Sequence, residues 1–157
     1  MVFIIVPVAA YILLSLLSYH AQDPGSFATS NTDEIRNLGG LTGAYLADFM
    51  LHFLGYFAYF LPVGLLYMAW RLYQDRNHDD DSWLDTTIKF LGFIASLLTG
   101  CGLSHLHADT NGQPFSGGGI IGDVVGSSVY AGFGGIGATL ILMATFLAGI
   151  TLFTGLS

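Results

Sequence analysis

Four long apolar runs constrain this chain more than any other feature. They cover about residues 1–19, 44–73, 84–104 and 135–157, and no Asp, Glu, Lys or Arg occurs between Phe49 and Trp70. A helix of about 17–25 apolar residues can cross the hydrocarbon core of a bilayer. Charged residues make up 10% of the chain, whereas soluble domains carry about 25%. The runs therefore predict an all-α membrane protein in which residues 1–157 form one domain with four transmembrane helices.

The few cations predict how these helices are oriented. Arg71, Arg76 and Lys89 flank the connection at 74–83, and Arg36 is the only other Lys or Arg in the chain. Because cytoplasmic loops carry the excess of Lys and Arg, we expect 74–83 and both termini in the cytoplasm. The loops at 20–43 and 105–134 then face outward. The net charge of −7 argues against a nucleic-acid-binding surface, which needs clustered cations.

The second outer loop contains a short amphipathic pattern. Ile121, Val125 and Val129 fall four residues apart, which predicts a short helix that lies in the outer interface or re-enters the bundle between the third and fourth spans. Glycines recur with the same spacing on this segment, at Gly118, Gly122 and Gly126. A stripe without side chains lets a helix approach another backbone closely. We expect this segment to press against a neighbouring element.

The stretch RNLGGLTGAYLAD, residues 36–48, joins the first outer loop to the second run. Gly39 and Gly40 are expected to end a short helix that begins near Asn31. Gly43 keeps the start of the second run thin enough for a close neighbour, for which the Gly118–Val129 segment is our candidate. Asp48 is expected to reach Arg36 or loop amides, because an unpaired carboxylate is costly in lipid. We interpret the stretch as a structural corner and a candidate partner surface.

Histidines supply the candidate chemistry. His105, His107 and Asp109 lie within five residues, and His and carboxylate side chains bind transition metals. Neighbours in a His-x-His pair converge on one ion only along an extended backbone, so polar interface residues are the favoured interpretation over a metal site. His52 is expected to be neutral and bonded to a neighbouring helix.

Motifs for catalysis and cofactor binding are absent from these residues. There is no GxxxxGK[ST], GxSxG, HExxH or CxxC pattern. The single cysteine, Cys101, lies in an apolar setting typical of a packed, inert thiol. We therefore expect neither an enzyme nor a cofactor within residues 1–157.

Five short strings occur along the chain in a fixed order relative to the four runs. They are LLS with DP close behind it (16–18, 23–24), NLGG-x-x-GA-x-LAD (37–48), LT-x-CGL with AD (98–103, 108–109), SGG with IG (116–122) and AG-x-TLFTG (148–155). In these strings the chain resembles one family, the amino-terminal four-helix membrane domain of the FtsK-type bacterial DNA translocases. The resemblance implies an inner-membrane domain at the division septum that contacts other division proteins. It also implies a cytoplasmic motor that uses ATP and Mg²⁺ and forms oligomers. The motor's motifs have no counterpart here, so no ATP-binding or DNA-binding residue carries over.

Two alternatives remain open from the sequence. Small residues spaced along the third and fourth runs close the bundle itself or join two protomers. A small four-helix transport or channel protein would instead use the bundle interior, with His52, Asp48 and the Gly-rich outer segment lining its path.

Overall fold

The computed structural model describes residues 2–27, 35–74, 83–108 and 114–155, and within these ranges it contains helices and no strand. The elements are α1 (Val2–Leu17), α2 (Gly40–Leu54), the 3₁₀ helix η1 (Gly55–Tyr59), α3 (Phe60–Gln74), α4 (Trp83–His107) and α5 (Gly119–Thr154). The expected all-α class is thus confirmed.

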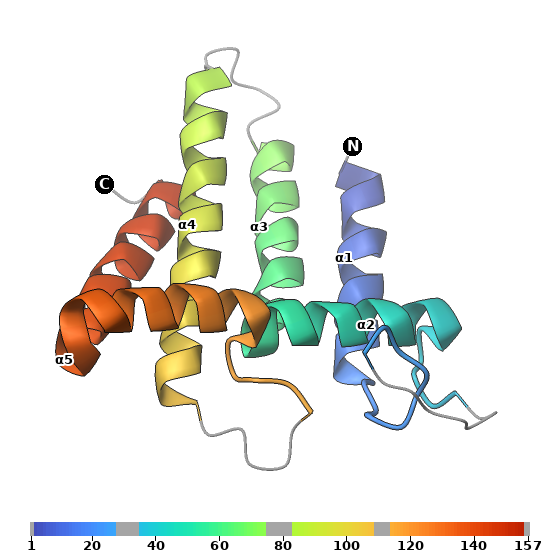
Figure 1. Ribbon diagram of the computed structural model, residues 1–157. Coiled ribbons are helices and arrows are strands. Elements are labelled where there is room, and N and C mark those ends of the chain that lie inside the picture. Colours follow the sequence, from blue (N-terminus) through green and yellow to red (C-terminus); the bar gives the residue numbers. More distant parts are fainter. Residues whose placement is uncertain (1, 28–34, 75–82, 109–113, 156–157) are drawn as a thin grey trace.

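The helices run in two directions (Figure 1). α1, α3, α4 and the second half of α5 extend alongside one another, whereas α2 and the first half of α5 run across them. The start of α1, the end of α3, the start of α4 and the end of α5 all lie at the same end of the molecule. We call this the terminal end, and the end that holds the loop after α1 the loop end.

The second apolar run is not one straight helix. It is divided into α2, η1 and α3, because Gly55 takes a left-handed φ of 59° that ends α2. The Gly55 position is also crowded: a Cβ there would overlap the backbone of Gly117 and lie 2.7 Å from the amide nitrogen of Gly119. Pro62 lies in the first turn of α3, where its missing N–H costs no helical hydrogen bond. The run is apolar on both sides of Gly55, so its hydropathy did not predict the break.

The short helix expected near 118–129 is longer and is joined to the fourth run. Helical structure begins at Gly119 and continues through a kink at Gly134, where φ is 68° and ψ is 177°. This backbone region is open essentially only to glycine. The kink turns α5 from the crossing direction into the direction of α4 (Figure 1).

Close helix contacts build the centre of the molecule. Gly92 of α4 and Gly149 of α5 face each other so closely that a Cβ on Gly92 would lie 2.8 Å from the Gly149 carbonyl oxygen. Aromatic rings fill the space beside this contact, with the centroids of Phe93 and Phe153 5.0 Å apart. α3 packs against the buried hydrophobic cluster with partly buried side chains such as Phe60 and Leu65. The buried members come from α1, α2, η1, α4, α5 and the loop before α5, and they are Ile12, Leu16, Ala47, Leu51, Leu54, Ala58, Phe93, Leu97, Cys101, Phe115 and Phe153.

Within the described residues, three helical stretches are long and apolar enough to cross a membrane. They are Gly40–Arg71, Thr86–His107 and Gly119–Thr154, and α1 contributes a shorter apolar stretch, Ile4–Leu17. Large apolar side chains are exposed on every helix, including Ile4, Val63, Ile136 and Leu140. In water this much exposed apolar surface would be a liability. The molecule is a membrane protein.

Candidate functional site

The stretch predicted as a corner joins the loop end of α1 to the start of α2. Asp23 is 4% exposed and its two carboxylate oxygens accept the amide N–H groups of Arg36, at 2.9 Å, and Asn37, at 2.8 Å. The Asn37 side chain donates to the carbonyl oxygen of Ser15 at 2.8 Å and accepts the Gly39 N–H at 2.8 Å. The Asp23 carboxylate and the Asn37 side-chain amide thus accept hydrogen bonds from the backbone N–H groups of residues 36, 37 and 39, which lie between the two helices.

Glycines allow this corner to close on α1. A Cβ on Gly43 would lie 2.7 Å from both Asn37 Oδ1 and Ser15 Oγ. Tyr11 donates its hydroxyl to the Gly39 carbonyl oxygen at 2.9 Å. The close neighbour of Gly43 is therefore α1, and the expectation that it would be the Gly118–Val129 segment is wrong.

Asp48 forms a second buried centre one helix further in. The residue is 1% exposed, and its carboxylate accepts the Phe27 N–H at 2.7 Å and the Tyr19 hydroxyl at 3.1 Å. The expectation that Asp48 would bind loop amides is confirmed by the Phe27 contact. The Arg36 backbone N–H donates to Asp23 rather than to Asp48, and the Arg36 residue is exposed.

His52 completes this centre from the next turn of α2. Its Nδ1 lies 2.9 Å from the Asp48 carbonyl oxygen and 3.2 Å from Asp48 Oδ1. Both neighbours are acceptors, so Nδ1 carries a proton and donates. The His52 ring stacks on Phe27 with centroids 4.7 Å apart and meets Phe115 edge-on at 6.2 Å. His52 was expected to bond to a neighbouring helix, but it bonds within α2 and packs on loop residues.

Tyr19 lies after the end of α1 and links that helix to Asp48. Burial raises the pKa of the Tyr19 phenol, and the negative charge of Asp48 raises it further. The phenol therefore stays protonated and acts as the donor at physiological pH. We name Tyr19, Phe27, Asp48 and His52 the Asp48 centre.

The glycine stripe on α5 meets α4. A Cβ on Gly118 would overlap the Cys101 carbonyl oxygen, one on Gly122 would lie 3.0 Å from the Cys101 carbonyl carbon, and one on Gly126 would lie 3.0 Å from the Gly102 carbonyl oxygen. The expected close approach to another backbone is found, with α4 as the neighbour. Cys101 is fully buried there and its thiol faces the Leu54 carbonyl oxygen at 3.4 Å.

The structure separates the two histidines weighed as metal ligands. His105 Nδ1 pairs with Asp123 Oδ1 at 2.7 Å, and Ser116 donates to the same oxygen at 2.8 Å. His107 lies two residues further along α4 and its Nε2 is 3.4 Å from Thr139 Oγ1. Residues two apart on a helix face different sides. Asp109 lies outside the described residues, and the residues that the structure covers include no group of three His, Cys, Asp or Glu placed to hold a metal ion.

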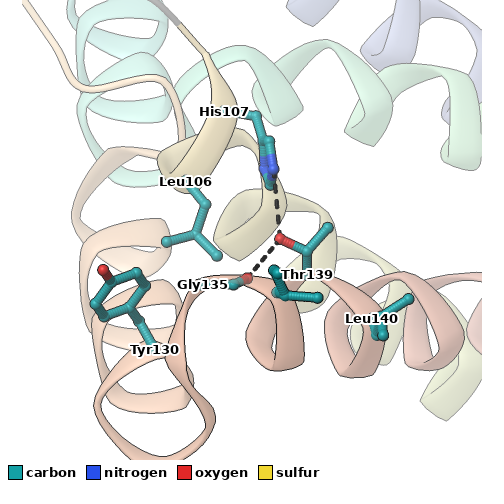
Figure 2. Close-up of a pocket in the computed structure, with 7 residues that line it drawn as sticks. Leu106, His107, Tyr130, Gly135, Thr139 and Leu140 are labelled. Carbon is teal, nitrogen blue, oxygen red and sulfur yellow. Dashed lines mark hydrogen bonds between the residues drawn. The ribbon is translucent and has the colours of Figure 1, made fainter.

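A cavity lies in the bend of α5 beside the end of α4 (Figure 2). It has a volume of about 440 Å³ and is lined by Leu106, His107, Tyr130, Gly135, Ile136, Thr139 and Leu140. Figure 2 shows Thr139 between His107 and Gly135, with its hydroxyl 2.9 Å from the Gly135 carbonyl oxygen. The lining is mostly apolar and the cavity is open to the surface, as expected for a hollow that faces lipid.

Sequence reasoning missed two members of these centres. It assigns Ser15 and Asn37 no role of their own, although Ser15 is a polar residue in an apolar run and is fully buried. Asp23 enters the sequence analysis only as part of the DP string at 23–24. Buried polar residues are almost always hydrogen-bonded, so a polar residue within or beside an apolar run is the signal that could have found them.

Fold and site together define a class: an all-α membrane domain whose buried polar residues fasten loops and helix ends. Residues 1–157 match, over their whole length, the family described as the 4TM region of DNA translocase FtsK/SpoIIIE. The chain belongs to this family, in agreement with the resemblance of its sequence strings.

Relatives in three bacteria carry the same name. Proteins named DNA translocase FtsK from Pseudomonas putida, Pseudomonas syringae pv. syringae and Shewanella oneidensis are 37%, 36% and 36% identical over 94%, 94% and 95% of this chain. The chain spans only 18%, 19% and 16% of these three proteins. No solved structure matches it.

Proposed function

We propose that this chain is the membrane-anchoring and septal-interaction domain of an FtsK-like DNA translocase that acts in cell division and chromosome segregation. The observation that carries the proposal is the match of the whole chain to the 4TM region of that family. The described residues form apolar helices and hydrogen-bonded loops, an arrangement suited to location and orientation. In this proposal ATP, Mg²⁺ and DNA are handled by a motor outside residues 1–157, and this domain performs no catalysis.

In the proposed topology α1, η1 with α3, α4 and the second half of α5 cross the cytoplasmic membrane. This places the terminal end in the cytoplasm and the loop end outside. Four crossings agree with the common end shared by the start of α1 and the end of α5 (Figure 1). Arg71 in the last turn of α3 and Lys89 in the first half of α4 lie toward that end, as the distribution of Lys and Arg in membrane proteins favours.

The proposed partners are the lipid bilayer, other septal division proteins and further copies of the full-length protein. The loop end is the proposed protein-contact side, because Arg36 and Leu38 are exposed there while the residues around them are fixed by Asp23 and Asn37. A transport function gains no support from the cavity in the bend of α5. Asp48 and His52 face Tyr19 and Phe27, and neither residue lines that cavity.

Cysteine accessibility in living cells tests the orientation. In a Cys101→Ser background, Leu38→Cys at the loop end should react with a thiol reagent that cannot cross the inner membrane. Tyr73→Cys, an exposed position at the terminal end, should react only after the membrane is opened. Labelling of Tyr73→Cys in intact cells would overturn the proposed topology.

Localisation tests the septal role. A fusion of residues 1–157 to a fluorescent protein should sediment with membranes and concentrate at division sites. Uniform fluorescence around the cell membrane would leave the anchor in place but refute the septal interaction.

A further inference from the structure

We propose that α2 and the first half of α5 form a lipid-binding belt that lies in the plane of the outer leaflet. The inference rests on the proposed membrane placement and goes beyond it, because hydropathy alone counts the whole of Gly40–Arg71 as one span. The partner is the interfacial zone of the bilayer, between headgroups and acyl chains.

The two crossing helices are joined end to end. The Tyr56 N–H, just after α2, donates to the Gly117 carbonyl oxygen, just before α5, at 2.9 Å. A Cβ on Gly119 would lie 2.6 Å from the Leu54 amide nitrogen. α2 and the first half of α5 therefore make one belt across the other helices (Figure 1).

The exposed stripe of α2 is apolar. Leu41, Tyr45 and Phe49 lie four residues apart and are 49%, 43% and 46% exposed. The ionisable side chains of this helix are turned away from the stripe, since Asp48 and His52 bind each other and Asp48 binds the loop that holds Phe27. A bare stripe that includes aromatic rings matches the enrichment of aromatic residues at membrane interfaces.

The first half of α5 divides its exposed surface into two edges. Ile120 and Val124, which are 44% and 62% exposed, form an apolar edge. Asp123 and Ser127 are exposed beside them and make the polar edge. A helix with one apolar and one polar edge lies in the interface with the apolar edge about 5–10 Å below the headgroups. Water on one side and lipid on the other satisfy both edges.

The belt makes the domain wider in one leaflet than in the other. α2 contains 15 residues, so with a rise of about 1.5 Å per residue and a diameter of about 10 Å it covers roughly 220 Å² of the leaflet. A helix that crosses the same leaflet occupies roughly 80 Å², from the same diameter. The belt thus adds area comparable to several crossing helices to the outer leaflet alone.

Depth-dependent quenching of tryptophan fluorescence tests the belt. The 157-residue chain is reconstituted in vesicles that contain lipids brominated either near the headgroup or near the end of the acyl chain. Trp70 and Trp83 are first replaced by Phe. We expect single Phe49→Trp and Val124→Trp variants to be quenched about twofold more by bromine near the headgroup than by bromine near the chain end, in keeping with interfacial depth. Tyr45→Trp serves as a second α2 variant in case Phe49→Trp fails to fold.

Two reference variants make the result decisive. Leu147→Trp, on the exposed face of the second half of α5, should be quenched most by bromine near the chain end. Ser127→Trp, on the polar edge, should be quenched less than Val124→Trp by either lipid. If Leu147→Trp is not quenched, the proposed membrane anchor fails. If Leu147→Trp is quenched but Phe49→Trp is either unquenched or quenched most by the deepest bromine, only the belt is overturned.

Discussion

A single buried carboxylate fastens the first loop to α2. Replacing Asp48 with Leu leaves the Phe27 N–H and the Tyr19 hydroxyl without their acceptor. An unsatisfied buried donor costs about 1–3 kcal/mol. We expect Asp48→Leu to insert normally but to lower the free energy of unfolding by roughly that amount and to speed hydrogen exchange at the Phe27 amide.

The matched control for this substitution is Asp123→Leu. The Asp123 side chain is 50% exposed, so water replaces its partners and the effect should stay below about 1 kcal/mol. Unchanged exchange at Phe27 in the Asp48→Leu protein would show that the carboxylate does not hold the loop.

A second prediction at the residue scale concerns the contact between α5 and α4. Gly118→Ala adds a methyl group where the Cys101 carbonyl leaves no room, and backbone cannot move aside as a flexible side chain can. Overpacking of this kind costs about 1–3 kcal/mol. We expect a lower midpoint in a titration of the purified chain with SDS. Gly135→Ala, whose Cβ would meet only Tyr130 at 3.4 Å, should leave the midpoint nearly unchanged.

At the scale of the element, the direction of a helix depends on one residue. Gly134 has a φ of 68° and no atom within 4 Å of the Cβ position, so an Ala there is opposed only by its own backbone conformation. We expect Gly134→Ala to destabilise the bent form by about 1–3 kcal/mol. The change is measured by unfolding in SDS, and by the distance between spin labels at Val124 and Leu147, which should lengthen as α5 straightens.

Gly132 offers a close control for that kink. It lies two residues earlier, also in open space, but within regular helix. Ala is a better helix former than Gly by up to about 1 kcal/mol, so Gly132→Ala should be neutral or slightly stabilising. If Gly134→Ala and Gly132→Ala destabilise the chain equally, the positive φ of Gly134 does not disfavour a side chain at that position.

The bends at Gly55 and Gly134 show the limit of what the sequence could predict. Helical class, the glycine stripe on α5 and the binding of Asp48 to a loop amide follow from composition, spacing and the cost of an unpaired charge. The break at Gly55 does not, because uncharged residues run from Phe49 to Trp70 on both sides of it. Gly39 was expected to end a helix and instead precedes α2, while the residues where that helix was expected, 28–34, lie outside the described ranges. The pairing of His105 with Asp123 also depends on how α5 lies over α4, which local pattern does not encode.

At the scale of the whole molecule, the chain is built from two halves with different contacts. In the first, α1, α2 and α3 are joined by polar groups such as Tyr59, which donates to the Leu16 carbonyl oxygen at 3.1 Å. In the second, α4 and α5 pack backbone to backbone through glycines. The halves meet where α2 joins α5 through the Tyr56–Gly117 hydrogen bond. They also meet where Tyr67 donates to the Thr154 carbonyl oxygen at 3.1 Å and where the Phe60 and Phe93 rings stack with centroids 5.8 Å apart.

This division predicts that the halves can recognise each other without a covalent link. Because preformed helices associate in lipid through close packing and hydrogen bonds, fragments 1–78 and 79–157 should co-purify when expressed together. Gly64→Leu places a large side chain against the Phe93 ring, which already lies within 3.1 Å of the Gly64 Cβ position. This change should weaken association by about 1–3 kcal/mol, seen as a several-fold loss of the second fragment from pull-down of the first.

Val63→Leu is the matched control. It enlarges the neighbouring residue, which is 54% exposed, and should leave recovery of the second fragment unchanged. If Gly64→Leu and Val63→Leu behave alike, the halves are held by contacts other than the Gly64–Phe93 interface.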